Sequence, residues 1–280
     1  MNKRLSVLLL TLLAACSTDD SLNITMDEGM GRMNLSVEIN DEVEASISTR
    51  AEESYSIPTD LVPESGDLKL SIYKRSGNNE DATSELYGEY VSLDDYDTPS
   101  MPVGYYTATV ESGEGIDTES STNAVFSGSV DFTVTDSEEA GQAAISASLA
   151  NAIVSLQVTD AFNNYYAGGA TLTLSTENGG EITIDFPNAS STDEILFVAP
   201  EAALYIAGTA VKQDPGTGTA PTVTFAKSKV GVATTGMMNN IIVDATETGG
   251  ASITVTINDT ITTVSTTTVD VNSGMTTTEE

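Results

Sequence analysis

The amino-acid sequence predicts an all-β protein. Apolar and polar residues alternate with a period of two in many short segments, as in strands with one buried and one solvated face. Clusters of Gly, Pro and Asn separate these segments and are typical of tight turns. No apolar stripe with a 3.6-residue period continues for three helical turns. The number and spacing of the strands indicate two tandem antiparallel β-sandwich domains, immunoglobulin-like or transthyretin-like in type.

The first predicted domain covers residues 31–150. Its opening strand is 33–39, where apolar residues such as Leu35 and Val37 alternate with polar ones. Residues 75–85 show no apolar period, and we expect them to form a long loop. The same alternation predicts further strands at residues 67–73, 106–110, 130–134 and 143–149.

The second predicted domain covers residues 151–280 and follows so closely that we expect a near-continuous strand or a stiff joint between the two. Asn178-Gly179-Gly180 predicts the turn of a hairpin between strands at 172–174 and 182–186. Segment 160–169 carries three aromatic residues, which favour a short helix that plugs the end of the sandwich over an aromatic platform for a ligand. Further strands are expected at 154–158, 195–198, 204–211, 223–226, 241–245, 253–257 and, as a Thr-rich closing edge, 264–271.

Residues 1–15 have the pattern of a lipoprotein signal peptide. Lys3 and Arg4 precede an apolar run at 5–13, which is too short to cross a bilayer because a helix needs about 20 residues to do so. Ala14-Ala15 then precedes Cys16, the single cysteine of the chain. We therefore expect Cys16 to be the first mature residue and to carry the acyl chains of a lipid anchor. The alternative is a general secretory signal in which Cys16 is incidental.

Residues 16–30 are polar and acidic, as expected for a flexible tether. Asp19 and Asp20 lie just behind the anchor. An acidic pair at this offset resembles the signal that sends Bacteroidetes lipoproteins to the outer face of the outer membrane. The resemblance implies a lipid-anchored protein that faces outward; the alternative is that the two carboxylates belong only to the tether.

Composition excludes several classes of function. The chain has 10 basic and 42 acidic residues, a net charge of −32, which repels nucleic acid and anionic lipid headgroups. It has no His, which excludes Ser-His-Asp and Cys-His catalysis and His-containing zinc sites. We therefore expect neither an enzyme nor a cofactor, although a carboxylate pair of the glycosidase type stays open.

Three local motifs give weaker signals. Asp94-Asp95-Tyr96-Asp97 gathers carboxylates as calcium sites do, but it lacks the Gly and the terminal Glu of an EF-hand, which favours a solvated acidic loop. Asp20-Ser21-Leu22 and Asp259-Thr260-Ile261 resemble the Bacteroidetes O-glycosylation acceptor, so Ser21 and Thr260 are candidate glycosylation sites.

Several segments, taken in their joint order, resemble a family of Bacteroidetes outer-membrane lipoproteins known as a domain of unknown function. The segments are 102–108, 149–155 with 160–162, and 204–210. The resemblance runs from about residue 31 to the C-terminus. It implies two tandem β-sandwich domains at the outer membrane and supplies no site residues.

A weaker resemblance, through Ser48-Thr49-Arg50-Ala51, is to fimbrillins, lipoprotein pilus subunits that an arginine-specific protease matures. The resemblance implies cleavage near Arg50, which would remove the predicted strand 33–39 together with the lipid. The apolar groove left behind could be filled by a strand of another subunit. The alternative is that Arg50 lies in an ordinary exposed loop.

Two functions follow from these patterns. The first is a non-catalytic cell-surface lipoprotein with a binding or structural role, attached to outer-membrane lipid through Cys16, whose loops contact host or glycan ligands or other surface proteins. The second is a fimbrillin-like pilus or adhesion subunit assembled by strand exchange.

Overall fold

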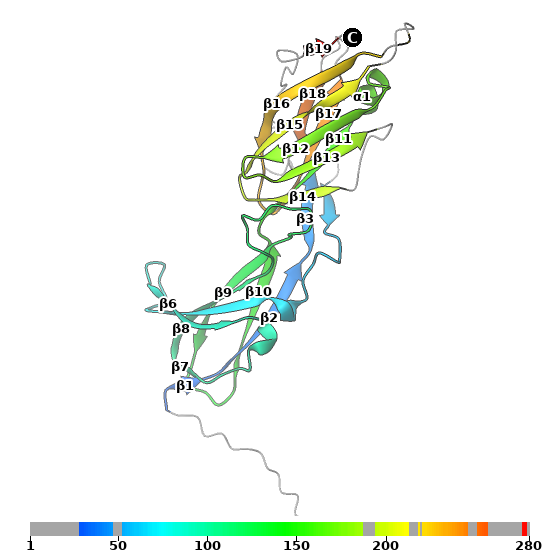
Figure 1. Ribbon diagram of the computed structural model, residues 1–280. Coiled ribbons are helices and arrows are strands. Elements are labelled where there is room, and N and C mark those ends of the chain that lie inside the picture. The colour runs from blue at the N-terminus through cyan, green and yellow to red at the C-terminus, as the bar shows by residue number, and fades with distance from the viewer. Residues whose placement is uncertain are drawn as a thin grey trace, which may run out of the picture.

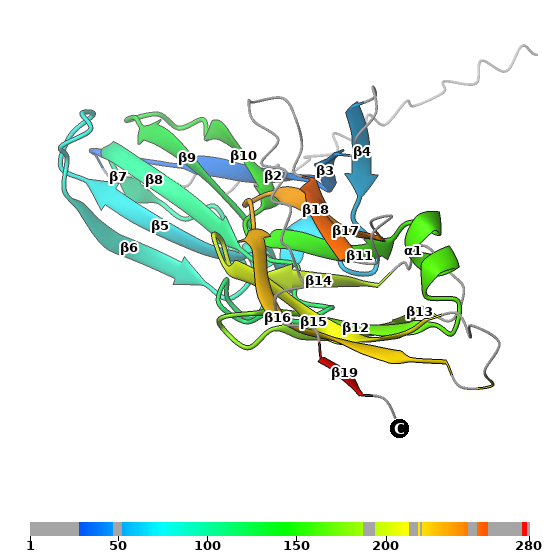
Figure 2. The same cartoon turned by 90° about the horizontal axis from the view of Figure 1, so that it is seen from above.

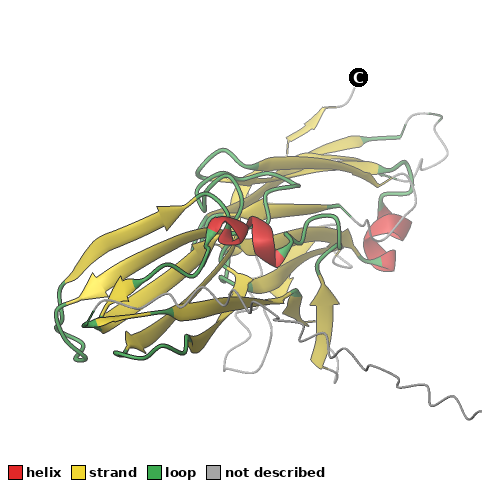
Figure 3. Cartoon of the chain, turned by 90° about the horizontal axis from the view of Figure 1, so that it is seen from below, coloured by secondary structure: helices red, strands yellow, loops and turns green. Residues whose placement is uncertain are grey.

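The computed structural model describes residues 28–46, 52–186, 194–212, 218, 220–245, 251–256 and 276–278. These residues form many strands with one short α-helix and two 3-10 turns, which confirms the predicted all-β fold class (Figure 3). None of the helices among them is long and apolar enough to cross a bilayer. The strands lie in two parts of an elongated molecule (Figure 1).

The first part is built on one six-stranded sheet, named the first sheet, in the order β2-β10-β9-β8-β5-β6. Neighbouring strands are antiparallel except β2 and β10, which run parallel along the full length of β2. The strands are β2 (Met33–Asn40), β5 (Lys69–Arg75), β6 (Ser84–Tyr90), β8 (Gly104–Glu111), β9 (Phe126–Val134) and β10 (Gly141–Leu149).

One face of the first sheet holds the first core. The period of two buries alternate residues such as Leu70 and Ile72 of β5 and Tyr106 and Ala108 of β8, all without exposed surface. Segment 91–103 closes this core through Tyr96 and Met101, which are buried in the same cluster. The closing elements are β1 (Met30–Gly31), which pairs with β7 (Met101–Pro102), and the 3-10 turns η1 (Ser65–Asp67) and η2 (Leu93–Asp95).

The second part is a sandwich of two sheets (Figure 2). One sheet has the order β14-β11-β17-β3-β4, with β18 also paired to β17, and the other has the order β13-β12-β15-β16-β19. Its core, named the second core, includes buried residues of both sheets, such as Val154 of β11 and Leu172 of β12. The elements are β3 (Glu42–Ser46), β4 (Glu52–Ser56), β11 (Ala152–Val158), α1 (Asp160–Tyr165), β12 (Ala170–Thr176), β13 (Glu181–Phe186), β14 (Ile195–Val198), β15 (Ala203–Val211), β16 (Thr222–Val232), β17 (Met237–Ala245), β18 (Ala251–Thr256) and β19 (Thr276–Thr278).

The chain crosses between the two parts three times, because it returns from β4 to the first sheet before β5. After β2, residue Asp41 leads into β3, which pairs in parallel with β17 and antiparallel with β4 in the second part. Only Ala150 and Asn151 separate β10 of the first sheet from β11 of the second part. The division of the chain at residue 150 stays a prediction; the hydrogen bonding assigns β3 and β4 to a sheet of the second part.

A third cluster of buried residues, named the joint core, fills the space where the two parts meet. It draws Val43 from β3, Phe126 and Leu149 from the first sheet, and Ile153 and Phe197 from the second part. Phe126, Ile153 and Phe197 have no exposed surface. The two parts therefore bury apolar side chains against each other. This shared core favours one rigid body over two domains that move independently about a hinge.

The local predictions and the structure differ at identifiable places. The hairpin around Asn178-Gly179-Gly180 is confirmed, with Gly179 at a positive φ of 104° that suits a residue without Cβ. The sequence did not predict β6, because an edge strand that is exposed on both faces has no apolar alternation. Three parallel pairings, β2 with β10, β11 with β17 and β3 with β17, depart from the antiparallel expectation. The predicted strand at 264–271 lies outside the described residues.

Candidate functional site

The predicted modification sites all lie outside the described residues. These are the lipid attachment residue Cys16, the glycosylation candidates Ser21 and Thr260, and the protease site at Arg50. Arg50 nevertheless falls, in chain order, between β3 and β4, two strands that pair with each other up to Ser46 and Glu52.

The acidic segment Asp94-Asp95-Tyr96-Asp97 lies over the first core. Its three carboxylates are exposed, whereas Tyr96 is buried and donates a hydrogen bond to the Met33 carbonyl oxygen at 2.8 Å. Burial raises the pKa of Tyr96 above its ordinary value. Within the described residues, no group of three or more acidic, Cys or His side chains is arranged to hold a metal ion. The segment therefore contributes a tyrosine anchor to the first core.

The aromatic segment forms the helix α1, as predicted. The Thr159 hydroxyl caps it by accepting a hydrogen bond from the Phe162 backbone N–H at 3.1 Å. Phe162 and Tyr166 are each 1% exposed and belong to the second core, with ring centroids 4.6 Å apart. The rings therefore close the end of the sandwich rather than face a ligand.

The loop 112–125 of the first part fastens the second part through Glu119. Its carboxylate accepts hydrogen bonds from the backbone N–H groups of Gly180 and Ala199, both at 2.9 Å. It also accepts from the Asn178 side chain at 3.2 Å and from the Thr176 hydroxyl. We name this arrangement the Glu119 clamp. It holds the β12–β13 turn and the end of β14 against the first part.

Ser120, the residue after Glu119, extends the sheet of the second part beyond β14. Ser120 and Phe197 exchange two backbone hydrogen bonds, of 3.1 and 2.8 Å, in an isolated antiparallel bridge. This bridge occupies the free edge of β14, so a loop of the first part covers an edge that would otherwise present unpaired backbone groups.

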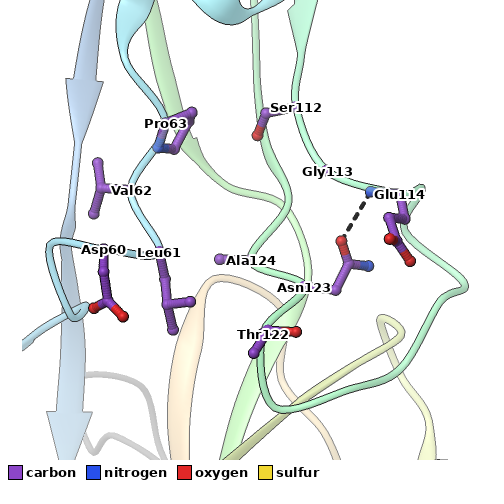
Figure 4. A pocket seen from close by; sticks show the side chains of 10 residues that line it. All are labelled: Asp60, Leu61, Val62, Pro63, Ser112, Gly113, Glu114, Thr122, Asn123 and Ala124. Carbon is purple, nitrogen blue, oxygen red and sulfur yellow. Dashed lines mark hydrogen bonds between the residues drawn. The ribbon is translucent and has the colours of Figure 1, made fainter.

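A pocket of about 270 Å³ lies beside the joint, between residues 60–63 and the loop 112–124 (Figure 4). The amide of Asn123 accepts from the Glu114 backbone N–H at 2.8 Å, and its two hydrogens go to backbone carbonyls within the same loop. The carboxylates left to face a ligand are the exposed Asp60 and Glu114. This pocket is therefore a feature of loop packing with little chemistry of its own.

The face of the first sheet that lies opposite the first core, named the outer face, has more varied chemistry. Exposed and half-buried side chains of β5, β6, β8 and β9 meet there, among them Tyr73, Leu86 and Tyr105. Arg75 forms an ion pair with Asp131 on the same face. The outer face thus combines aromatic rings with a fixed pair of charges.

The sequence analysis missed both the Glu119 clamp and the outer face. Tyr73 occupies a wet position in the alternation of β5, and Tyr105 occupies the equivalent position in β8. Aromatic residues at positions that face water are the signal that could have drawn attention to this face. Glu119 gives no such signal, because its partners are backbone groups far along the chain.

Comparisons with known proteins give one family and several distant structures. The family model described as a domain of unknown function (DUF4493) matches residues 29–273. The comparison with curated proteins gave no match. Among solved structures, a fimbrial assembly protein from Parabacteroides distasonis is 9% identical with a TM-score of 0.42, over 81% of this chain and 98% of that chain. A candidate cell adhesion protein from Bacteroides uniformis is 13% identical with a TM-score of 0.38, over 83% of this chain and 99% of that chain.

Proposed function

The chain belongs to the family described as a domain of unknown function (DUF4493), and we propose that this member is a non-catalytic lipoprotein of the cell surface. In this proposal acylated Cys16 attaches the chain to the outer membrane, and the folded part faces outward and binds a ligand. The residues from Cys16 up to β1 are the tether between the lipid and the folded part.

The observation that carries the proposal is the joint. The joint core and the Glu119 clamp hold the two parts as one elongated body. The chain enters this body at β1, and α1 and β19 lie at its opposite end (Figure 1). A lipid at Cys16 would therefore place the first sheet near the membrane and the sandwich of the second part away from it. A stiff scaffold of this kind suits display and binding.

The anchor is tested by metabolic labelling with a palmitate analogue in the native host. The Cys16→Ser variant should lose the label and the surface location, because serine has no thiol to acylate. Ser17→Ala, the matched control, should keep both. Digestion of intact cells with a protease should remove the wild-type protein. Persistent label in Cys16→Ser, or a wild-type protein protected from the protease, would contradict the proposal.

A second candidate function is a fimbrillin-like subunit matured by cleavage near Arg50. The specific observation in its favour is that β2 and β3 both precede Arg50 in the chain. β2 is a terminal strand of the first sheet, and its removal would expose the edge of β10. Met33 of β2 and Val43 of β3 are each 4% exposed, so cleavage would also open apolar grooves in two cores. A strand of another subunit could fill them by β-augmentation.

The mature N-terminus separates the two functions. The first predicts a chain that begins at acylated Cys16 and runs as a monomer on gels without boiling. The second predicts an N-terminus at Ala51 and a ladder of oligomers. Arg50→Lys, which keeps the positive charge but removes the arginine, would abolish the ladder under the second function and change nothing under the first.

A further inference from the structure

We propose that the outer face of the first sheet, at the corner formed by β5, β6 and β8, binds a neutral glycan chain. The inference rests on the proposed function, because it names the ligand class and the site of a surface-binding protein. Three observations support it: an aromatic corner, an ordered hydrogen-bonding network beside it, and the pairing of the basic side chains around both.

The aromatic corner is contiguous. Tyr73 lies directly opposite Leu86 of β6 and Thr107 of β8 in the strand register. Tyr105 is two residues from Thr107 along β8 and is therefore a diagonal neighbour of Tyr73. Tyr105 is 38% exposed and Leu86 57% exposed, although leucine is among the residue types most often buried. Their side chains project away from the first core, whose residues occupy the alternate positions.

The hydrogen-bonding network lies beside the tyrosines. Arg75 lies opposite Tyr105 in the register, and its Nη1 forms an ion pair with Asp131 while its Nη2 donates to the Asn79 carbonyl oxygen at 2.8 Å. The Thr107 hydroxyl donates to the other Asp131 oxygen at 2.5 Å. The Arg75 side chain is only 12% exposed, but that of Asp131 is 60% exposed. Each Asp131 oxygen keeps acceptor capacity toward solvent, held in a fixed orientation.

This combination matches the two surfaces of a sugar ring. A pyranose presents an apolar C–H face, which stacks on an aromatic ring, and a rim of hydroxyls, which donate to carboxylates and accept from hydroxyls. Tyrosine rings supply the first contact with little loss of conformational entropy. The remainder of the outer face carries small polar side chains such as Ser129, Ser146 and Ser148, so an extended chain can lie across the strands without obstruction.

A glycan fits this face better than a protein partner does. Stable protein interfaces bury roughly 800 Å² on each partner around an apolar centre. Here the exposed apolar groups are confined to one corner, and hydroxyl groups surround it. The two basic side chains of this face are paired, Arg75 with Asp131 and Lys69 with Glu89 at 2.6 Å. Glu111, opposite Lys69 in the register, adds a negative charge, so the face offers no free positive charge to an anionic ligand. The chain's net charge of −32 repels an anionic glycan.

The test is affinity electrophoresis of the full-length protein, extracted in a non-ionic detergent, in native gels. The gels contain starch, a β-1,3-glucan, xyloglucan or an α-mannan, with heparin as the anionic comparison. We expect at least one neutral polysaccharide to retard the wild-type protein and heparin to leave it unaffected. Tyr73→Ala and Tyr105→Ala should each weaken retardation by about fivefold to tenfold, as expected for loss of one aromatic contact.

The matched control is Tyr205→Ala in β15, a half-buried tyrosine of the second part whose ring lies under the Lys227 ammonium at 4.9 Å. It should keep wild-type retardation. Thermal unfolding of each variant identifies any that fails to fold, and Tyr105→Phe then replaces Tyr105→Ala, because it keeps the stacking ring and should retain most of the binding. The inference is overturned if none of the four neutral polysaccharides retards the protein, if heparin alone does, or if Tyr205→Ala weakens binding as much as Tyr105→Ala.

These outcomes are separate from those of the proposed function. A protein that is acylated at Cys16 and accessible on cells, but is not retarded by the polysaccharides, retains the proposed function and loses this inference. A protein that is neither acylated nor surface-exposed loses the proposed function whatever the gels show.

Discussion

Removal of the Glu119 carboxylate should weaken the joint between the two parts. In Glu119→Ala, the backbone N–H groups of Gly180 and Ala199 lose an acceptor at 2.9 Å. A hydrogen bond to a charged group contributes about 1.5–3 kcal/mol when it is buried. Glu119 is half-buried, so water replaces part of the loss, and we expect about 1 kcal/mol for each of these two bonds and less for the side-chain partners.

The expected loss is therefore about 2–3 kcal/mol of unfolding free energy. For a chain of this size, that corresponds to a fall in Tm of about 4–12 °C. Denaturant unfolding followed by circular dichroism measures the change. Because the clamp joins the two parts, its loss should also divide a single transition into two, as the parts begin to unfold separately.

Gly180 tests the same contact from its other side. A Cβ at this position would lie 2.4 Å from the Glu119 Oε2 atom and 2.8 Å from the Glu119 Cβ, so Gly180→Ala should displace the carboxylate. The double variant should then lose less than the sum of the two single variants. Glu114→Ala, an exposed carboxylate of the same loop, is the matched control and should change stability by less than about 0.5 kcal/mol. Equal losses in Glu114→Ala and Glu119→Ala, or strict additivity in the double variant, would refute the clamp.

Four further changes test other parts of the fold. Phe197→Ala should lower the unfolding free energy by about 3–5 kcal/mol in denaturant unfolding, because it opens a cavity in the joint core, where Phe197 has no exposed surface. A loss below about 1 kcal/mol would mean that the joint core does not stabilise the fold. Gly208→Ala should destabilise by about 1–3 kcal/mol or more, since its Cβ would lie 2.2 Å from the Thr171 carbonyl oxygen; a calorimetric Tm equal to that of the wild type would contradict the register. Burial raises the pKa of Tyr106 and of Tyr166 to about 12, and a raised tyrosine pKa favours the neutral folded form. The stability from these groups is complete below pH 10 and lost as the pH rises through 12, which absorbance at 295 nm follows. Tyr166→Phe removes a buried hydroxyl that has no partner among the described residues, and should raise stability by about 1 kcal/mol and remove one late-titrating tyrosine; a fall in stability would show that the hydroxyl is satisfied.

The strands that the sequence predicted best are those with one wet face. β2, β5, β8 and β10 follow their alternation closely, because one side of each packs on the first core. β6 lacked such a pattern, because neither face of this exposed edge strand packs fully against a core, and its residues therefore need not alternate between apolar and polar. α1 was predicted from its aromatic residues, and the structure shows why: Phe162 and Tyr166 complete the second core.

The candidate sites divide in the same way. The period of the strands places Tyr73 and Tyr105 on a solvated face, although their proximity to Arg75 and Asp131 depends on the register of two strand pairs, β5 with β8 and β8 with β9. The role of Glu119 could not be read at all, since its partners at residues 176–180 and 199 are distant in the chain.

The sequence by itself determined where most strands lie, though not β3, β4 or β6, which side of each predicted strand is apolar, and where the hairpin turn at residues 178–180 falls, because these depend on residues one or two positions apart. Only the tertiary structure decided that β3 pairs with β17, that one loop closes the edge of β14, and that both parts share a core. Backbone N–H and C=O groups are the same in nearly every residue, so the sequence does not specify which of these groups will pair. The partner is chosen by how the folded surfaces pack together.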